Sequence, residues 1–135
     1  MAIQLSTNVR NARLDAIETT VGTSAVLKIR TGAAPANCAA ADSGTVLATV
    51  NCPSDWMAAA ASGSKAMSGT WQDASADATG TAAHFRLYAS DGTTCHMQGT
   101  VTATGGGGDM TVESTSFTAA QQFTVTSFSL TDGNA

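Results

Sequence analysis

Two histidines, His84 and His96, are the only imidazoles in the chain and the first candidates for acid–base chemistry. A serine hydrolase needs an imidazole to accept the serine proton and a carboxylate to orient the ring. Both histidines fall on the polar side of two alternating segments, Ala83–Ala89 and Cys95–Ala103, which contain no acidic residue. We therefore expect no catalytic triad, and we expect that the protein is not an enzyme.

The three cysteines, Cys38, Cys52 and Cys95, form an odd set without a CxxC pair. Cys95 directly precedes His96, so in an extended segment the two side chains point to opposite faces and ligate one metal poorly. We expect small buried cysteines, no metal site and no cofactor. Cys38 and Cys52 could pair under oxidising conditions, but the spacing alone does not bring their Cβ atoms together.

The same two segments carry a polar, partly aromatic face. Either solvent or another part of the chain covers such a face, or it contacts a partner, because Arg and Tyr are favoured at protein interfaces. Trp56 and Trp71 have the same two uses, with core packing favoured. The candidate interface residues on this face are His84, Arg86, Tyr88, His96 and Gln98, with Thr100 beside them.

These side chains are positioned by a β-hairpin that the alternation predicts between Thr81 and Ala103. A two-residue loop would mix the two faces. A three-residue loop, Ser90–Gly92, would pair Leu87 with Cys95 and Phe85 with Met97, and would leave Gly92 in the left-handed conformation.

Ahead of the hairpin, the spacing predicts an amphipathic helix from Thr7 to Val21, capped by Thr7 or Asn8 and ended by Gly22. The helix could close an end of its own sheet, or dock on a neighbouring subunit. We expect the N-terminal arm and the helix to contact another subunit. The apolar side of the helix comprises Val9, Ala12, Ala16 and Ile17, and the candidate interface residues here are Met1, Ile3, Leu5, Arg10 and Arg13.

The rest of the chain contains short strand-like runs separated by irregular segments. The final run, Gln122–Thr131, switches the phase of its apolar residues near Thr126, which predicts a bulge or a strand moving between two sheets. We predict an all-β protein, an antiparallel jelly-roll-like sandwich over residues 24–135, with an arm and helix over residues 1–23. The other predicted strands are Ala25–Arg30, Thr45–Asn51 and Ala66–Gln72; Thr31–Gly44 is predicted to be a loop, and Ala58–Ala61 is ambiguous.

Composition narrows the classes of function. Ala, Thr, Ser and Gly make up more than half of the 135 residues, and the net charge is −4 with six basic side chains. So few cations disfavour direct binding to nucleic acid. No apolar run approaches the roughly 18 residues that span a bilayer, so we expect no membrane partner and synthesis in a cytoplasm.

Several segments together resemble the small virion proteins of tailed bacteriophages that are found beside the major capsid protein. None of these segments is a catalytic signature. The resemblance lies in residues 11–18 (NARLDAIE), 27–32 (LKIRTG) with Pro35, 80–88 (GTAAHFRLY), 91–93 (DGT), 98–101 (QGTV) and 125–128 (VTSF).

The resemblance implies a capsid decoration or cement protein with a jelly-roll-like sandwich, added to the outside of the virion head. Its partners would be the major capsid protein and further copies of itself, as a homodimer or homotrimer, with assembly in the host cytoplasm. An alternative is a carbohydrate- or receptor-binding module of a tail or fibre, which would use Tyr88 and the tryptophan faces. The family offers no functional-residue motif to transfer to this chain.

Overall fold

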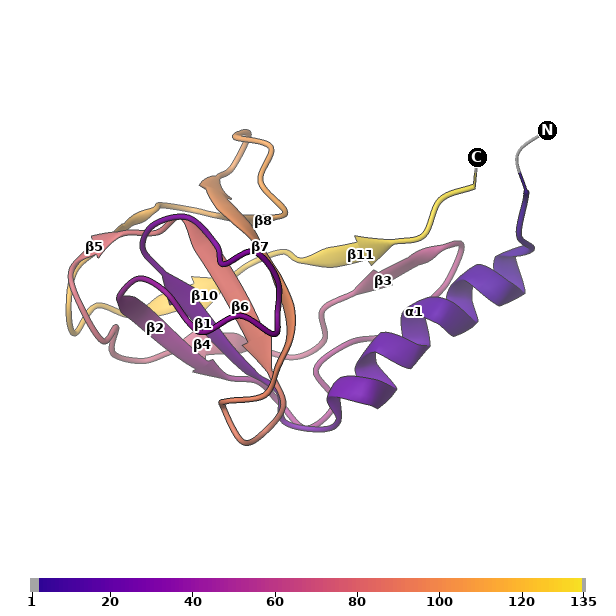
Figure 1. Ribbon diagram of the computed structural model, residues 1–135, viewed down its shortest axis with the longest axis horizontal. Helices are drawn as coiled ribbons and strands as arrows, with labels where there is room; N and C mark the ends of the chain where they lie inside the picture. The colour runs from indigo at the N-terminus through magenta and orange to yellow at the C-terminus, as the bar shows by residue number, and fades with distance from the viewer. Residues whose placement is uncertain (1–2, 135) are drawn as a thin grey trace.

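The computed structural model describes residues 3–134. Within them the chain forms one helix, α1 (Thr7–Val21), and eleven strands, so the prediction of a mainly β protein with an N-terminal helix is confirmed (Figure 1). No helix in this part of the chain is long and apolar enough to cross a membrane.

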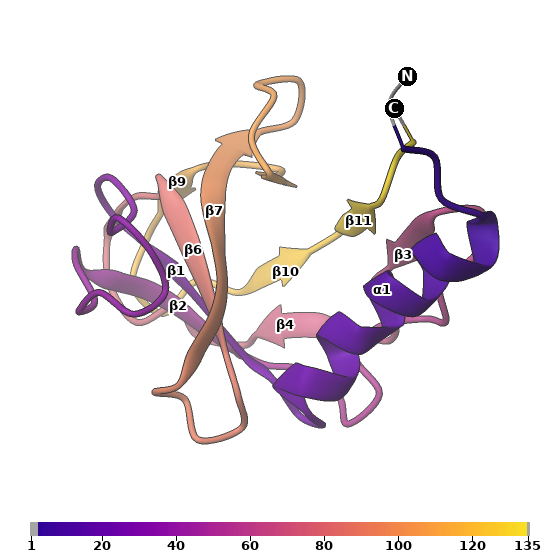
Figure 2. The same ribbon diagram turned by 45° about the vertical axis from the view of Figure 1, so that its right-hand side comes forward.

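The largest element is a curled sheet of five strands in the order β2-β1-β6-β7-β8, which bends around one side of the molecule (Figure 2). The first four strands pair antiparallel, but β7 and β8 pair parallel, so the sheet is mixed and not wholly antiparallel as predicted. The strands are β1 (Val26–Arg30), β2 (Val46–Asn51), β6 (His84–Tyr88), β7 (Cys95–Ala103) and β8 (Met110–Val112).

Three two-stranded sheets complete the body. The predicted phase switch near Thr126 is confirmed as a strand that changes sheets: the chain pairs first with β4 and then, after the switch, with β3. These sheets pair β10 (Phe123–Val125) with β4 (Trp71–Asp73), β11 (Ser129–Thr131) with β3 (Ser64–Ala66), and β5 (Gly80–Thr81) with β9 (Ser116–Phe117).

The β6–β7 hairpin forms, but its predicted register is wrong by two residues. Leu87 pairs with Met97 and Phe85 with Gly99, and a bulge follows Leu87. The loop is longer than predicted because the Asp91 carboxylate accepts hydrogen bonds from the backbone amides of Thr93 and Thr94. A shift of two residues keeps Met97 and Val101 on their predicted face, but the bulge pairs Cys95 with Tyr88 and so moves Cys95 to the polar face. Gly92 has the predicted positive φ of 70°.

A glycine tract makes the parallel pairing of β7 and β8 possible across a very short connection. Parallel neighbours usually need a crossover of a dozen or more residues. Here the chain turns back within residues 104–109, and Val101 already pairs with Met110. A Cβ atom on Gly106 would lie 2.7 Å from the side chain of Thr102, so the turn requires glycine at that position.

The core lies between the inner face of the five-strand sheet and the small sheets. An aromatic chain crosses it: ring centroids of Trp56 and Trp71 lie 6.0 Å apart, those of Trp71 and Phe128 5.7 Å apart, and Phe128 meets Phe85 edge-on at 5.8 Å. The indole of Trp56 donates to the carbonyl oxygen of Gly22 at 2.9 Å. Both tryptophans therefore serve core packing, the favoured prediction.

Helix α1 has the predicted limits but not the predicted contacts. Its N-cap is Ser6, one residue before the predicted candidates, and Gly22 ends it as expected. Leu14 and Val21 are its buried residues, whereas Val9 remains 45% exposed. Of the predicted apolar side, Ala12 and Ala16 are also exposed and Ile17 is half-buried, because the opposite side makes polar contacts with the body.

Candidate functional site

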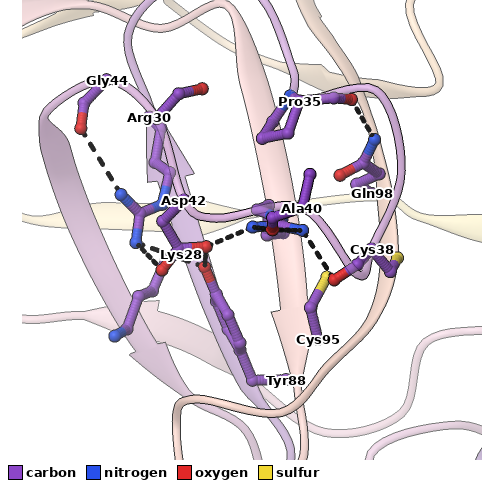
Figure 3. Close-up of polar contacts among 12 residues, drawn as sticks. Lys28, Arg30, Pro35, Cys38, Ala40, Asp42, Gly44, Tyr88, Cys95 and Gln98 are labelled. Atoms are coloured by element: carbon purple, nitrogen blue, oxygen red, sulfur yellow. Dashed lines mark hydrogen bonds and ion pairs between the residues drawn. The ribbon is translucent and has the colours of Figure 1, made fainter.

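The polar face of the hairpin is covered by the chain itself. His84, Arg86 and Tyr88 are exposed by 0%, 1% and 0% of their surface. The covering segment is residues 31–44, which we call the cover loop; it connects β1 to β2 and lies across β6 and β7 (Figure 3). The sequence left open whether this face is covered by the chain or contacts a partner. For these three side chains, the structure shows that the chain covers them.

Asp42 is the centre of this arrangement (Figure 3). Its carboxylate accepts hydrogen bonds from Arg86, from Arg30 at 2.9 Å and from the Tyr88 hydroxyl at 2.7 Å. Burial alone would raise the pKa of Asp42, but the hydrogen bonds from Tyr88 and Arg86 and the two arginine charges outweigh burial and hold the pKa below its ordinary value. The carboxylate is therefore the anion that balances two buried cations.

Arg86 gathers the backbone of the cover loop. Its guanidinium donates to the carbonyl oxygens of Asn37 at 3.1 Å, Cys38 at 3.0 Å and Ala40 at 3.2 Å. Arginine suits this task because its planar fork offers five donors in fixed directions. The guanidinium acts as an internal template for the loop, in place of the partner contact predicted for it.

Further contacts hold both ends of the cover loop. Near its start, the amide of Gln98 donates to the Pro35 carbonyl oxygen at 2.6 Å, and the Nδ1–H of His84 donates to the Gly32 carbonyl oxygen at 2.7 Å. Near its end, Arg30 donates to the Gly44 carbonyl oxygen at 3.4 Å. Of the five candidate residues on this face, His96 alone is exposed.

Tyr88 shows how closely the loop seals the face. Burial raises the pKa of its hydroxyl to about 12, and its hydrogen bond to Asp42 acts in the same direction. Lys28 lies over its ring, with Nζ 5.0 Å from the centroid, and donates to the Gly92 carbonyl oxygen at 3.1 Å. A cation above a buried ring adds a favourable electrostatic contact, so the face is arranged for stability.

The chemistry available at this site is hydrogen bonding and charge neutralisation. His84 has a backbone carbonyl as its partner, where a general base of the triad type would have an orienting carboxylate. Among residues 3–134, no group of three or more His, Cys, Asp or Glu side chains could hold a metal ion. Asp42 is the residue that the sequence reasoning missed, although cations at positions 28, 30 and 86 on one face indicate a nearby anion.

The second group of candidate residues lies around the start of α1. Met1 is outside the described residues, and Ile3 is 85% exposed. Leu5 is half-buried and is tied to the C-terminal segment: its backbone N–H donates to the Asn134 side chain, which donates back to its carbonyl oxygen, both at 2.8 Å. The arm is thus held beside residues 132–134, with its apolar side chain at position 3 outward.

The two arginines of the helix both turn toward Asp132. Arg10 donates to the Asp132 carbonyl oxygen at 3.0 Å, and Arg13 forms an ion pair with the Asp132 carboxylate at 3.3 Å. The side chain of Arg13 is 61% exposed. Exposed pairs contribute little energy, so Arg13 is available to a partner, whereas Arg10 is committed to the chain's own C-terminal segment.

A buried lysine joins α1 to the body, which the sequence reasoning did not predict. Lys65 of β3 is 1% exposed, and its ammonium contacts Asp15 at 2.7 Å, Glu18 at 2.8 Å and the Ala58 carbonyl oxygen at 2.9 Å. Burial would lower the pKa of Lys65, but the hydrogen bonds with the two carboxylates outweigh burial and raise it. Residues 58–61, ambiguous in the sequence, form no helix and instead offer their backbone to this contact.

Two surface hollows complete the candidate sites. One, of about 430 Å³, lies beside Lys65 and the polar side of α1. The other, of about 280 Å³, has amide and hydroxyl side chains around Phe117 and Phe123. The centroids of those two rings lie 4.8 Å apart, and both side chains are buried. Neither ring is therefore accessible for a ligand to stack on.

Comparison of the chain with protein-family models, curated proteins and solved structures finds no match.

Proposed function

We propose that the protein is a structural virion protein of a tailed bacteriophage, a decoration or cement protein that binds the outside of the head. In this role it stabilises contacts between major capsid protein subunits. The segments that resemble such proteins extend over nearly the whole chain, from α1 to β10. The low-charge Ala, Thr and Ser surface suits close packing of many copies, because short side chains lose little rotamer entropy on burial.

The observation that carries the proposal is the outward apolar side of the arm and α1. Ile3 and Val9 are the large hydrophobic side chains that remain exposed among the described residues, at 85% and 45%. The helix keeps this side outward because it contacts the body through Asp15 and Glu18. A clamp that joins two capsomers needs such an accessible surface, since many modest contacts add up through multivalency.

In this role the protein contacts the major capsid protein and further copies of itself, as a dimer or trimer. It uses no cofactor or metal, has no catalytic centre and makes no direct contact with nucleic acid or membrane. The resemblance also implies a jelly-roll-like antiparallel sandwich. The observed β-rich body with an N-terminal helix supports that family at a coarser level, and the proposed attachment depends on the arm and α1.

The alternative function, a carbohydrate- or receptor-binding module of a tail or fibre, relied on Tyr88 and the tryptophans as stacking faces. All three residues are 0% exposed. Sugar recognition of that kind needs an accessible ring, so the head-binding role is better supported by this structure.

The test uses purified heads that lack the protein, to which the full-length chain is added back. Bound copies are counted by quantitative mass spectrometry, and the temperature at which heads rupture is recorded. We expect many copies per head, in a fixed ratio to the major capsid protein, and rupture at a higher temperature. A deletion of residues 1–5 should lower occupancy, whereas Glu113→Gln, beside the hollow at β9, should bind normally.

Three results would contradict the proposal. They are no binding to heads, only a few copies per particle at the tail, or full occupancy by the chain that lacks residues 1–5. The deletion variant must first show the unfolding midpoint of the wild type, so that lost binding reflects the missing arm.

A further inference from the structure

Two free cysteines lie at the edge of the cover loop. Cys38 lies in the loop and Cys95 is the first residue of β7 (Figure 3). Arg86 donates to the Cys38 carbonyl oxygen at 3.0 Å. Tyr88, two residues further along the same face of β6, pairs with Cys95 across the hairpin. The Cys95 thiol donates to the Met97 carbonyl oxygen at 3.5 Å, and the nearby Cys38 thiol helps to raise the pKa of Cys95. The contacts of Arg86 and Tyr88 therefore hold the two cysteine residues near each other on one face of the hairpin.

The third cysteine is placed differently. Cys52 follows β2, is 5% exposed, and its backbone N–H donates to the Ala25 carbonyl oxygen at 2.9 Å. Burial raises the pKa of its thiol to about 12. Cys38 and Cys95 are both free and half-buried, so an oxidant reaches them more readily than it reaches Cys52. The pairing of Cys38 with Cys52, which the sequence left open, has no support in this geometry.

We propose that Cys38 and Cys95 form an intramolecular disulfide when the protein meets a disulfide oxidant, and that this bond fastens the cover loop to β7. The pair would oxidise whether or not the protein binds a virion head, so this site is independent of the proposed function. The loop's existing contacts with Arg86 and Gln98 hold residue 38 in place, which favours the bond over a link between two chains.

The reaction is thiol–disulfide exchange with a small disulfide such as oxidised glutathione. The Cys38 thiolate attacks one sulfur of the oxidant, which forms a mixed disulfide and releases one glutathione thiolate. The Cys95 thiolate then attacks the Cys38 sulfur and releases the second. Two cysteine S–H bonds are lost and one S–S bond forms, while the oxidant accepts two electrons and the released thiolates take up the two protons.

Cys95 acts second because its environment holds its proton. Burial first, and then the nearby Cys38 thiol, raise the pKa of the Cys95 thiol to about 11, although the nearby Arg86 charge acts in the opposite direction. The first step thus falls to the loop cysteine. In the second step the mixed disulfide is already beside Cys95, so a small thiolate fraction suffices for closure.

The experiment treats the purified full-length protein with oxidised glutathione and compares it with the reduced protein. Intact-mass measurement detects the loss of two hydrogens, and tryptic mapping identifies the linked peptides. Trypsin cuts after Arg30, Lys65 and Arg86, so the expected link joins peptide 31–65 to peptide 87–135. Because peptide 31–65 also contains Cys52, the same map is recorded for Cys52→Ser as the matched control.

We expect the link in the wild type and in Cys52→Ser, and its absence in Cys38→Ser and Cys95→Ser. Oxidation should raise Tm of the wild type by roughly 10 °C, reversibly on reduction, because the bond constrains a long stretch of the unfolded chain. Failure of Cys52→Ser to form the internal link would overturn the proposal. A link through Cys52, or one that forms only between two chains, would overturn it as well.

Discussion

At the scale of single residues, Asp42 has the largest effect on the described site. Its carboxylate contacts Arg30, Arg86 and Tyr88 together. Its loss would leave two buried guanidinium groups without their shared anion. The free energy lost when a buried charge is left unpaired exceeds the net free energy that the original pair contributed. Substitution of Asp42 should therefore destabilise the whole cover loop.

Asp42→Asn should lower the free energy of unfolding by roughly 2 kcal/mol. This magnitude is below that of a fully buried pair because the Asp42 side chain is 40% exposed and solvent screens its charge. Urea denaturation followed by tryptophan fluorescence measures the change. The exposed Asp55→Asn is the matched control and should stay within about 0.5 kcal/mol of the wild type; equal behaviour of the two variants would refute the role of Asp42.

Asp42 also predicts the response to acid. Its pKa is lowered in the folded state, so it contributes stability above its ordinary unfolded pKa of about 3.9, and this contribution is lost as the pH falls toward the folded value. The Tm of the wild type should therefore fall below about pH 5. Asp42→Asn should show a shallower fall over the same range, measured by thermal unfolding at successive pH values. Parallel curves would show that other carboxylates, such as Asp91, determine the acid response.

At the scale of elements, the period of the apolar residues predicted β1, β2, β6 and β7. The predicted strand Ala66–Gln72 was wrong, because this segment is divided between β3 and β4 of two different sheets. The hairpin and the sheet change near Thr126 follow from local alternation, which reports which face of a segment is buried, and the helix limits follow from helical spacing and the capping residues. The predicted register of the hairpin was wrong because it depends on the side chain of Asp91, which lengthens the loop. The parallel pairing of β7 and β8 was not predicted. The glycine turn allows the chain to return beside β7, but tertiary contacts determine which strand β8 pairs with.

The prediction of the buried side of α1 was wrong for a different reason. Its apolar residues were assigned to the buried side, but Lys65 recruits Asp15 and Glu18 and turns the polar side inward. A lysine in a short strand is normally expected to be exposed to solvent, so nothing in the sequence indicated the contact of Lys65 with the helix. The division into an arm with a helix and a β body, at residue 23, remains a prediction.

Lys65→Met should weaken the attachment of α1. Methionine keeps the length of the side chain but leaves the carboxylates of Asp15 and Glu18 without their cation. This loss should lower the free energy of unfolding by about 2 kcal/mol. Urea denaturation measures the loss. Arg13→Met removes an exposed ion pair and should change stability by less than about 1 kcal/mol. If both variants lose the same free energy, the buried lysine has no special role.

At the scale of the whole molecule, the chain uses its polar groups internally and leaves an apolar side at one end. His84, Arg86 and Tyr88 were predicted at an interface because alternation assigns them to the polar face, and that face was correct. The cover loop that buries them has no period of its own, so the sequence could not place it. The exposed residues of the arm and helix, together with His96, are thus the part of the predicted interface that remains accessible.

A charge on that side should disrupt self-association. In the double variant Val9→Glu and Ala12→Glu, we expect dimers or trimers to form at least about tenfold more weakly, equivalent to ~1.4 kcal/mol, because burying carboxylates at a contact is unfavourable. Sedimentation velocity over a range of concentrations measures this. Thr118→Glu, on an exposed turn after β9, should associate normally. A wild type that stays monomeric at high concentration would remove self-association from the proposed role.

The hydrogen bonds between Leu5 and Asn134 bring the two described ends of the chain, residues 3–5 and 132–134, to one corner of the molecule, as both ribbon views show (Figures 1 and 2). A short peptide could therefore join these ends into a backbone-cyclised ring, and new ends could be opened in the exposed turn at residues 90–93 with little strain. The same proximity means that a cargo domain fused to either end would emerge from the same corner.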